Sequence, residues 1–245
     1  MRKIFIDCGA HRGESITAFC DHHSDSKEYE VFSFEPSQSQ MIKSCIKESI
    51  SQNVNRTKEI TFFNKAVWIE NCENTFYDRA LLDHSQSESS TLIPDMVTLI
   101  DPATSEKKTI GLPVTVECVD LGMWIKANFS EEDHIILKLD VEGAEYDILY
   151  KMATDGSIEY VNKLFCEVHG SKCGKTYYET LKLMSTMWSK GHKIYHWAAN
   201  SLGEYLKETR EGRGFYTDDI IKKEYENWAK KGWKRIINGQ AVKEV

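Results

Sequence analysis

The feature that most constrains the fold of this chain is the segment IDCGAHRGES at residues 6–15, where an apolar strand runs into a turn between two glycines. Glycine adopts backbone angles that other residues avoid, and it lets the backbone approach a ligand closely. A strand, a glycine turn and a helix in this order are typical of α/β domains that seat a nucleotide cofactor. Gly9 and Gly13 therefore predict such a seat, although an ordinary glycine turn between two core elements would leave the same pattern.

The spacing of the turn separates two kinds of cofactor. A dinucleotide fingerprint reads G-x-G-x-x-G and holds a diphosphate, whereas this chain reads D-x-G-x-x-x-G from Asp7 to Gly13. A carboxylate would repel a diphosphate but attract a cation. S-adenosylmethionine carries an ammonium and a sulfonium and no phosphate, so the pattern favours it over NAD.

Short strands alternate with helical stretches along the chain, which predicts a parallel sheet covered by helices on both faces. Strands are expected at residues 3–9, 30–36, 60–68, 163–170 and 191–199, and helices at 14–21, 37–50 and within 212–236. Residues 114–128 and 135–153 are each expected to form a strand followed by a helix.

Two regions break this alternation within what we expect to be one domain over residues 1–245. Around residues 70–112 the chain is irregular and rich in Ser, Thr and Pro, which predicts an inserted loop or lid, with a poorly ordered surface insertion as the alternative. Around residues 190–245 aromatics accumulate, and three of the six Trp follow residue 196. These aromatic rings either stack on a sugar or pack in the core.

Composition excludes several classes of protein. The net charge of -7 argues against nucleic acid as a partner, because phosphate binding needs a surplus of Lys and Arg. The seven Cys are scattered without a C-x-x-C pair, so neither a zinc site nor a disulfide framework is expected. No apolar run reaches the ~20 residues of a membrane span, and the start of the chain does not resemble a secretion signal. We therefore expect a cytoplasmic protein with no stable membrane insertion.

Glu35 follows the second predicted strand, 22 residues beyond Gly13. An acid at this point of a nucleotide-binding sheet accepts hydrogen bonds from both ribose hydroxyls of the cofactor. A solvated acid at the end of a strand is the alternative for Glu35 taken alone. Because Glu35 follows the glycine turn at the expected distance, we favour the ribose role.

The segment KLDVEGAE at residues 138–145 places Lys138, Asp140 and Glu142 on alternate positions after an apolar run. Alternate residues of a strand point to the same side, here toward the edge where open sheets bind ligands. Burying three charges costs several kcal/mol unless they are paired or bound to something. A functional site is favoured over a purely structural Lys-Asp pair.

The segment CEVHG at residues 166–170 places Glu167 and His169 at the end of another strand. We expect the strands before Asp140 and Glu167 to be neighbours, so that these acids, Glu142 and His169 converge. Such a cluster activates a hydroxyl or holds a divalent metal through hard ligands. The sequence does not favour a metal, and a structural role for His169 is the alternative.

The motifs IDCGAHRGES, FEPS, KAV, ESST, VDLGMWI, ILKLDVEGAEYDIL and CEVHG follow in the order found in the FkbM family of methyltransferases, which the chain resembles over roughly residues 4–170. The resemblance implies a Rossmann-like three-layer fold with a mostly parallel seven-stranded sheet, S-adenosyl-L-methionine as methyl donor, and O-methylation of a sugar or polyketide hydroxyl. It carries nothing beyond residue 190, where we expect acceptor specificity to lie.

Carried over residue by residue, the resemblance implies a cofactor site, while the charged segments at residues 138–145 and 166–170 supply the candidate catalytic residues. The cofactor residues would be Asp7, Gly9, Ala10, His11 and Gly13 for the methionine part, Glu35 with Pro36 for the ribose, Asn64 to Val67 including Ala66 for the adenine, and Asp140. The catalytic residues would be Asp140, His169, Lys138, Glu142 and Glu167.

The sequence thus favours an S-adenosylmethionine-dependent O-methyltransferase acting on a sugar hydroxyl. Asp140 or His169 is the expected base, because a weakly acidic hydroxyl must lose its proton as the new bond forms. A small metabolite or polyketide hydroxyl is an alternative acceptor. An NAD-type oxidoreductase and a catalytically silent Rossmann-like interaction module are alternatives of other classes, and the oligomeric state is left open.

Overall fold

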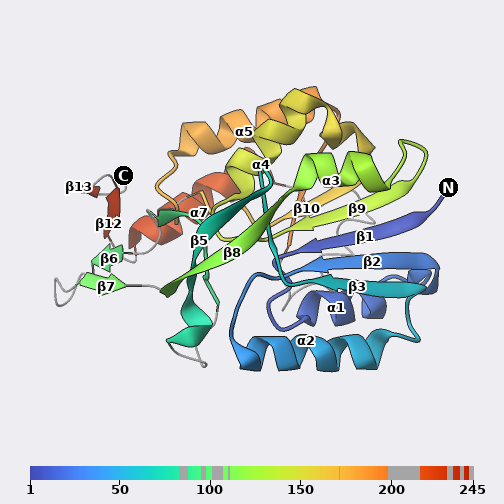
Figure 1. The fold of residues 1–245 in the computed structure, drawn as a ribbon. Coiled ribbons are helices and arrows are strands. Elements are labelled where there is room, and N and C mark those ends of the chain that lie inside the picture. Colours follow the sequence, from blue (N-terminus) through green and yellow to red (C-terminus); the bar gives the residue numbers. More distant parts are fainter. Residues whose placement is uncertain are drawn as a thin grey trace.

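The computed structural model describes residues 1–82, 88–94, 98–100, 107–109, 111–170, 172–197, 216–230, 234–237 and 240–242. Its centre is a six-stranded sheet with the strand order β11-β10-β9-β1-β2-β3, in which every pairing is parallel (Figure 1). The strands are β1 (Lys3–Cys8), β2 (Tyr29–Phe34), β3 (Glu59–Phe63), β9 (His134–Leu139), β10 (Val161–Cys166) and β11 (Ile194–His196).

Helices cover both faces of this sheet, which confirms the predicted three-layer α/β class. In Figure 1, α1 and α2 lie on one face and α3, α4 and α5 on the other. Among the described residues no helix combines the length and the apolar character needed to cross a membrane. The helices are α1 (Glu14–His22), α2 (Gln40–Asn53), α3 (Leu121–Asn128), α4 (Glu145–Asp155), α5 (Tyr177–Ser189) and α7 (Asp218–Lys230), with short 3-10 turns η1 (Ser26–Glu28), η2 (Arg79–Leu81) and η5 (Ser157–Tyr160).

A second sheet corrects the expectation for residues 60–68 and for the start of the region 70–112. The strand expected at 60–68 breaks after β3, and its second half, β4 (Ala66–Trp68), pairs in parallel with β8 (Leu112–Asp120). The strand β5 (Cys72–Asp78) runs antiparallel to β8. The central sheet therefore holds six described strands where seven were expected, because β4 and β8 build the smaller sheet.

The remaining part of the region 70–112 also contains strands. In the part of the chain that the structure describes, β6 (Thr98–Ile100) and β7 (Lys107–Thr109) pair antiparallel with each other. β6 also pairs with β12 (Lys234–Ile237), which pairs with β13 (Gln240–Val242). The insertion and the C-terminal portion thus share one four-stranded sheet.

The core lies on both faces of the central sheet, because successive residues of a strand point to opposite sides. Ile4 and Ile6 of β1 belong to the large apolar cluster beneath α3, α4 and α5. Phe5 points the other way and stacks on Phe19 of α1, with ring centroids 4.2 Å apart. Phe5 and Phe19 belong to a second buried apolar cluster, which also contains Trp197, one of the three C-terminal Trp. Trp228 and Trp233 lie outside the residues whose side chains the structure describes.

Candidate active site

A cavity of about 420 Å³ opens at the carboxyl ends of β1, β2, β9 and β10, a size usual for small-molecule sites. From β1 the chain winds toward β2 and β3, and it later returns on the other side of β1 with β9. This reversal of strand order between β1 and β9 is where open α/β sheets bind ligands. The turns after these two strands therefore meet at the cavity.

The glycine turn after β1 packs tightly against the turn after β9. Gly9 has a φ of 78°, and a Cβ added there would lie 1.8 Å from the backbone oxygen of Asp140. The amides of Gly9 and Ala10 both donate to the carbonyl of Phe34 at 3.0 Å. Gly9 is thus required for the close passage of two backbones, and it also lines the cavity.

Asp7 lies behind the cavity wall, not among the residues that line it. Its carboxylate is fully buried, and Oδ2 accepts hydrogen bonds from the hydroxyls of Ser15 at 2.6 Å and Ser33 at 3.3 Å. Oδ1 lies 3.3 Å from Nζ of Lys138. The acid that the sequence assigned to the cofactor is thus paired inside the protein with two serine hydroxyls and a buried lysine.

Lys138 connects the two turns. Its Nζ donates to the carbonyl of Gly9 at 2.6 Å and lies 3.4 Å from Oδ2 of Asp140. Burial opposes the charge, but Asp140 and Asp7 together hold the pKa of Lys138 above its ordinary value. The ammonium therefore fixes the positions of the glycine turn and Asp140 relative to each other.

Glu35 is buried at the end of β2 and lines the cavity. Its two carboxylate oxygens accept hydrogen bonds from the backbone amides of His11 at 2.8 Å and Ser37 at 2.9 Å. Burial raises the pKa of Glu35 to about 7. Each oxygen keeps a further lone pair for a ligand hydroxyl. Asn64 lies behind this wall and donates to the carbonyls of Glu35 and Ser37.

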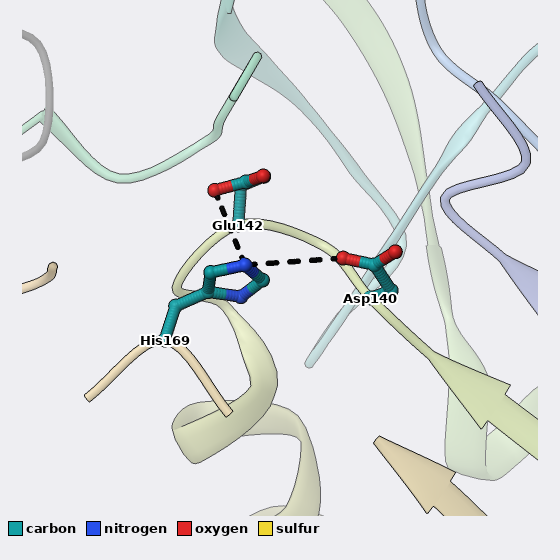
Figure 2. A group of neighbouring side chains, drawn as sticks. All are labelled: Asp140, Glu142 and His169. Carbon is teal, nitrogen blue, oxygen red and sulfur yellow. Dashed lines mark ion pairs between the residues drawn. The ribbon is translucent and has the colours of Figure 1, made fainter. Parts of the chain in front are cut away.

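His169 lies beside Asp140 and Glu142, two acids that line the cavity (Figure 2). The ring is 1% exposed, and Nδ1 lies 2.9 Å from Oε1 of Glu145. Nε2 lies 3.4 Å from Glu142, 3.4 Å from Glu167 and 3.9 Å from Asp140. The strands before these groups are neighbours, as predicted, since Leu139 of β9 pairs with Cys166 of β10.

The strands end earlier than the sequence suggested. β9 stops at Leu139, so Asp140 and Glu142 lie in the turn that leads to α4. Glu142 has a positive φ of 51°, which is uncommon for a residue with a side chain. The carbonyl of Glu142 accepts a hydrogen bond from Thr91 at 2.6 Å. The insertion thus supports the turn that carries the acidic groups.

The electrostatics of the cluster follow from burial and from mutual pairing. Burial raises the pKa of Asp140 to about 6, although Lys138 lowers it. Burial alone would lower the pKa of His169, but Glu142 and Glu145 hold it well above the ordinary value. Burial would also raise the pKa of Glu167, which its ion pair with His169 instead brings down to about 2.

Most of the residues singled out in the sequence line this cavity, but four do not. Asp7, Gly13, Asn64 and His169 are not among the lining residues; Gly13, with a φ of 85°, is the N-cap of α1 and passes close to Ser49 of α2. Those that line it are Gly9, Ala10, His11, Glu35, Pro36, Ala66, Lys138, Asp140, Glu142 and Glu167.

The site also contains residues that were not expected from the sequence. Glu145 belongs to KLDVEGAE, but nothing in the sequence indicated that this acid is fully buried and accepts the amides of Val141 and Gly143, each at 2.9 Å. Lys172 lines the cavity after CEVHG and has no local signature. Phe76, Leu92 and Ser90 bring the region 70–112 to the cavity, as the lid hypothesis would require.

A parallel sheet with a glycine turn at its switch point and a buried acid after the second strand defines a Rossmann-like α/β protein with a small-molecule site. The chain belongs to the FkbM methyltransferase family, since the model of the methyltransferase FkbM domain matches residues 7–194.

Two further comparisons add little to this assignment. A crystal structure of a methyltransferase FkbM from Methylobacillus flagellatus KT is similar at 12% sequence identity and a TM-score of 0.39. The match covers 76% of this chain and 37% of that protein. A search of curated proteins found no match.

Proposed function

We propose that this chain is an S-adenosylmethionine-dependent O-methyltransferase whose acceptor is a sugar hydroxyl. The observation that carries the proposal is the pair of acidic regions in one cavity, with Glu35 at the end of β2 and Asp140, Glu142 and Glu167 after β9 and β10. Membership of the FkbM family supports methyl transfer as the reaction class.

The residues present fit a cationic nucleoside better than a dinucleotide. Glu35 keeps lone pairs on both oxygens and is within the cavity, so it suits two ribose hydroxyls. The turn from Gly9 to His11, Glu14 and Asp140 line the same cavity. Carboxylates attract an ammonium and a sulfonium and repel a diphosphate. This supports the methyl donor over the NAD alternative.

When bound, S-adenosylmethionine supplies a methyl carbon that its sulfonium makes electrophilic. The chain itself must align an acceptor oxygen with that carbon, and holding reactants in place accounts for a large part of such rate enhancements. Lys138 fixes Asp140 at 3.4 Å, and the insertion fixes the Glu142 turn through Thr91. The acceptor end of the cavity is therefore held by these two contacts.

A hydroxyl acceptor also needs a group that takes its proton. Asp140 and Glu167 line the cavity, whereas His169 lies behind it with Nδ1 held by Glu145. We therefore assign the proton acceptor to one of these two carboxylates, and we assign His169 to positioning them. Lys138 and Glu142 would hold the acceptor or offset developing charge.

The experiment that tests this function is transfer of a labelled methyl group from S-adenosylmethionine to a panel of simple glycosides, small hydroxylated metabolites and polyketide alcohols. The proposal expects label in at least one glycoside and more than in the other acceptors. Label only in the other acceptors would show that the acceptor hydroxyl belongs to another class of molecule and not to a sugar. Binding of neither S-adenosylhomocysteine nor NAD would revive the silent interaction module.

A further inference from the structure

We propose that Asp140, Glu142 and His169 form a site for a divalent cation of the Mg²⁺ or Mn²⁺ class. One carboxylate oxygen from each acid and a ring nitrogen of His169 all lie within 4.8 Å of one another (Figure 2). The proposal of a cation site rests on the structure and does not depend on the function proposed above. The use of the cation in catalysis rests on that function.

The imidazole is oriented as metal-binding histidines are. A carboxylate behind the ring commonly accepts the other N–H and so directs the free nitrogen to the metal. Here Glu145, itself fully buried, accepts the hydrogen bond from Nδ1 at 2.9 Å. This leaves Nε2 directed at Glu142 and Asp140 (Figure 2).

Two buried atoms of the cluster lack a hydrogen-bond partner among the residues described. They are Nε2 of His169 and Oε2 of Glu142, which lie 3.4 Å apart. Buried polar atoms are rarely left without a hydrogen bond, and an ion that is absent from the coordinates is one of the explanations for such cases. Their separation suits two ligand atoms that share one ion at roughly 2.0–2.6 Å. These two unpartnered atoms indicate a bound ligand, and this observation is independent of how many acids lie in the cluster.

The donor set indicates the class of cation. Two carboxylates and one imidazole provide hard oxygen ligands with a single nitrogen, and the structure describes no thiol in the cluster. Asp140 and Glu142 line the cavity, so open coordination positions would face the acceptor. Glu167 lies outside the trio and stays available to take the proton.

A cation must compete with two positive groups, the proton that Glu142 and Glu145 favour on His169 and the ammonium of Lys172. Nζ of Lys172 lies 3.8 Å from Oε2 of Glu142 and 3.9 Å from Oε1 of Glu167. An ammonium at this distance repels a second cation. Removing the charge of Lys172 should therefore strengthen cation binding, whereas removing the charge of Glu142 should weaken it.

The test is a titration of Mn²⁺ into the protein, followed by electron paramagnetic resonance, which reports the free aqueous ion. Four proteins are compared: wild type, Glu142→Gln, Lys172→Met and the control Glu131→Gln. Glu131 is an exposed acid before β9, at the opposite end of this strand from the site. Thermal unfolding identifies any variant that fails to fold. If Glu142→Gln fails to fold, Asp140→Asn takes its place.

The proposal expects one Mn²⁺ per chain. Glu142→Gln should bind it at least ~10-fold more weakly, the usual cost of losing even an outer-shell partner of a metal. Lys172→Met should bind it more tightly, Glu131→Gln should match wild type, and Mg²⁺ should displace Mn²⁺. Absence of binding by wild type at about 1 mM, the weak limit of biological Ca²⁺ sites, would overturn the proposal. Equal affinities of wild type and a folded Glu142→Gln would overturn it too.

Calorimetry with S-adenosylhomocysteine on the same samples separates this site from the proposed function. If S-adenosylhomocysteine binds and Mn²⁺ does not, the cation site is wrong and the methyltransferase proposal stands. If Mn²⁺ binds as expected and S-adenosylhomocysteine does not, the cation site stands and the methyltransferase proposal fails.

Discussion

His169 and Glu145 form a buried pair, with Nδ1 of the imidazole 2.9 Å from Oε1 of the carboxylate. Glu145 begins helix α4 and also accepts the amides of Val141 and Gly143, so one carboxylate holds both the turn after β9 and the ring after β10. The pair thus joins two neighbouring strand ends of the site.

Glu145→Gln should destabilise the protein strongly. The neutral amide has one acceptor oxygen in place of two and cannot balance a charged ring, so we expect a loss of about 3 kcal/mol in the free energy of unfolding, as for other broken buried pairs. Urea unfolding measures it. Asp147→Asn, an exposed acid in the same helix, is the matched control and should stay within about 0.5 kcal/mol of wild type. Equal effects of both variants would argue against the role of the pair.

Gly9→Ala should be more harmful than its backbone angle alone explains. Gly9 and Gly156 have nearly equal φ values of 78° and 79°, but only at Gly9 would a Cβ meet another backbone. Gly156→Ala should cost about 1–2 kcal/mol from the left-handed conformation. Gly9→Ala should cost clearly more, because Asp140 must move away. Similar melting temperatures for the two variants would show that the close contact between the turns is unimportant.

Glu35→Gln should change how stability depends on pH. The folded state raises the pKa of Glu35 from 4.5 to about 7, so the contribution of Glu35 to stability is complete below pH 4.5 and is lost as the pH rises through 7. Over this window wild type should lose on the order of 3 kcal/mol relative to Glu35→Gln. Urea unfolding at several pH values measures this difference. A difference that does not vary with pH would contradict the raised pKa.

Asp140→Asn and Glu167→Gln distinguish the two candidate proton acceptors. The variant that lacks the acceptor should lose about 10²- to 10⁴-fold in the methyl-transfer rate measured at saturating S-adenosylmethionine. Single-turnover assays with a responsive glycoside give the rate. If both variants and His169→Ala keep full turnover with intact cofactor binding, the catalytic assignment is wrong.

The parts of the fold and of the site that depend on local sequence could be predicted. The turn from Gly9 to Gly13 carries its two glycines, and the segment from Lys138 to Glu142 its three charges, within a few residues. Their approach follows from the winding of parallel strands. The helix α5 also had a local signal that was missed, the capping box of Thr176 and Glu179.

Other features depend on partners far along the chain. β5 is a strand because β8 pairs with it, some forty residues later, and its polar residues give no sign of this. Asp7 was expected to face a cofactor, but its burial reflects Lys138, 131 positions away in sequence. Lys172 and Thr91 reach the acidic cluster from loops. No local pattern encodes such contacts, because tertiary packing decides them.

The most direct test of the central claim is calorimetric titration of the purified protein with S-adenosylhomocysteine and, separately, with NAD. The account expects binding of S-adenosylhomocysteine, no detectable binding of NAD, and a weaker affinity for S-adenosylhomocysteine in Glu35→Ala, whose ribose acceptor is gone. Binding of NAD without binding of S-adenosylhomocysteine would contradict it.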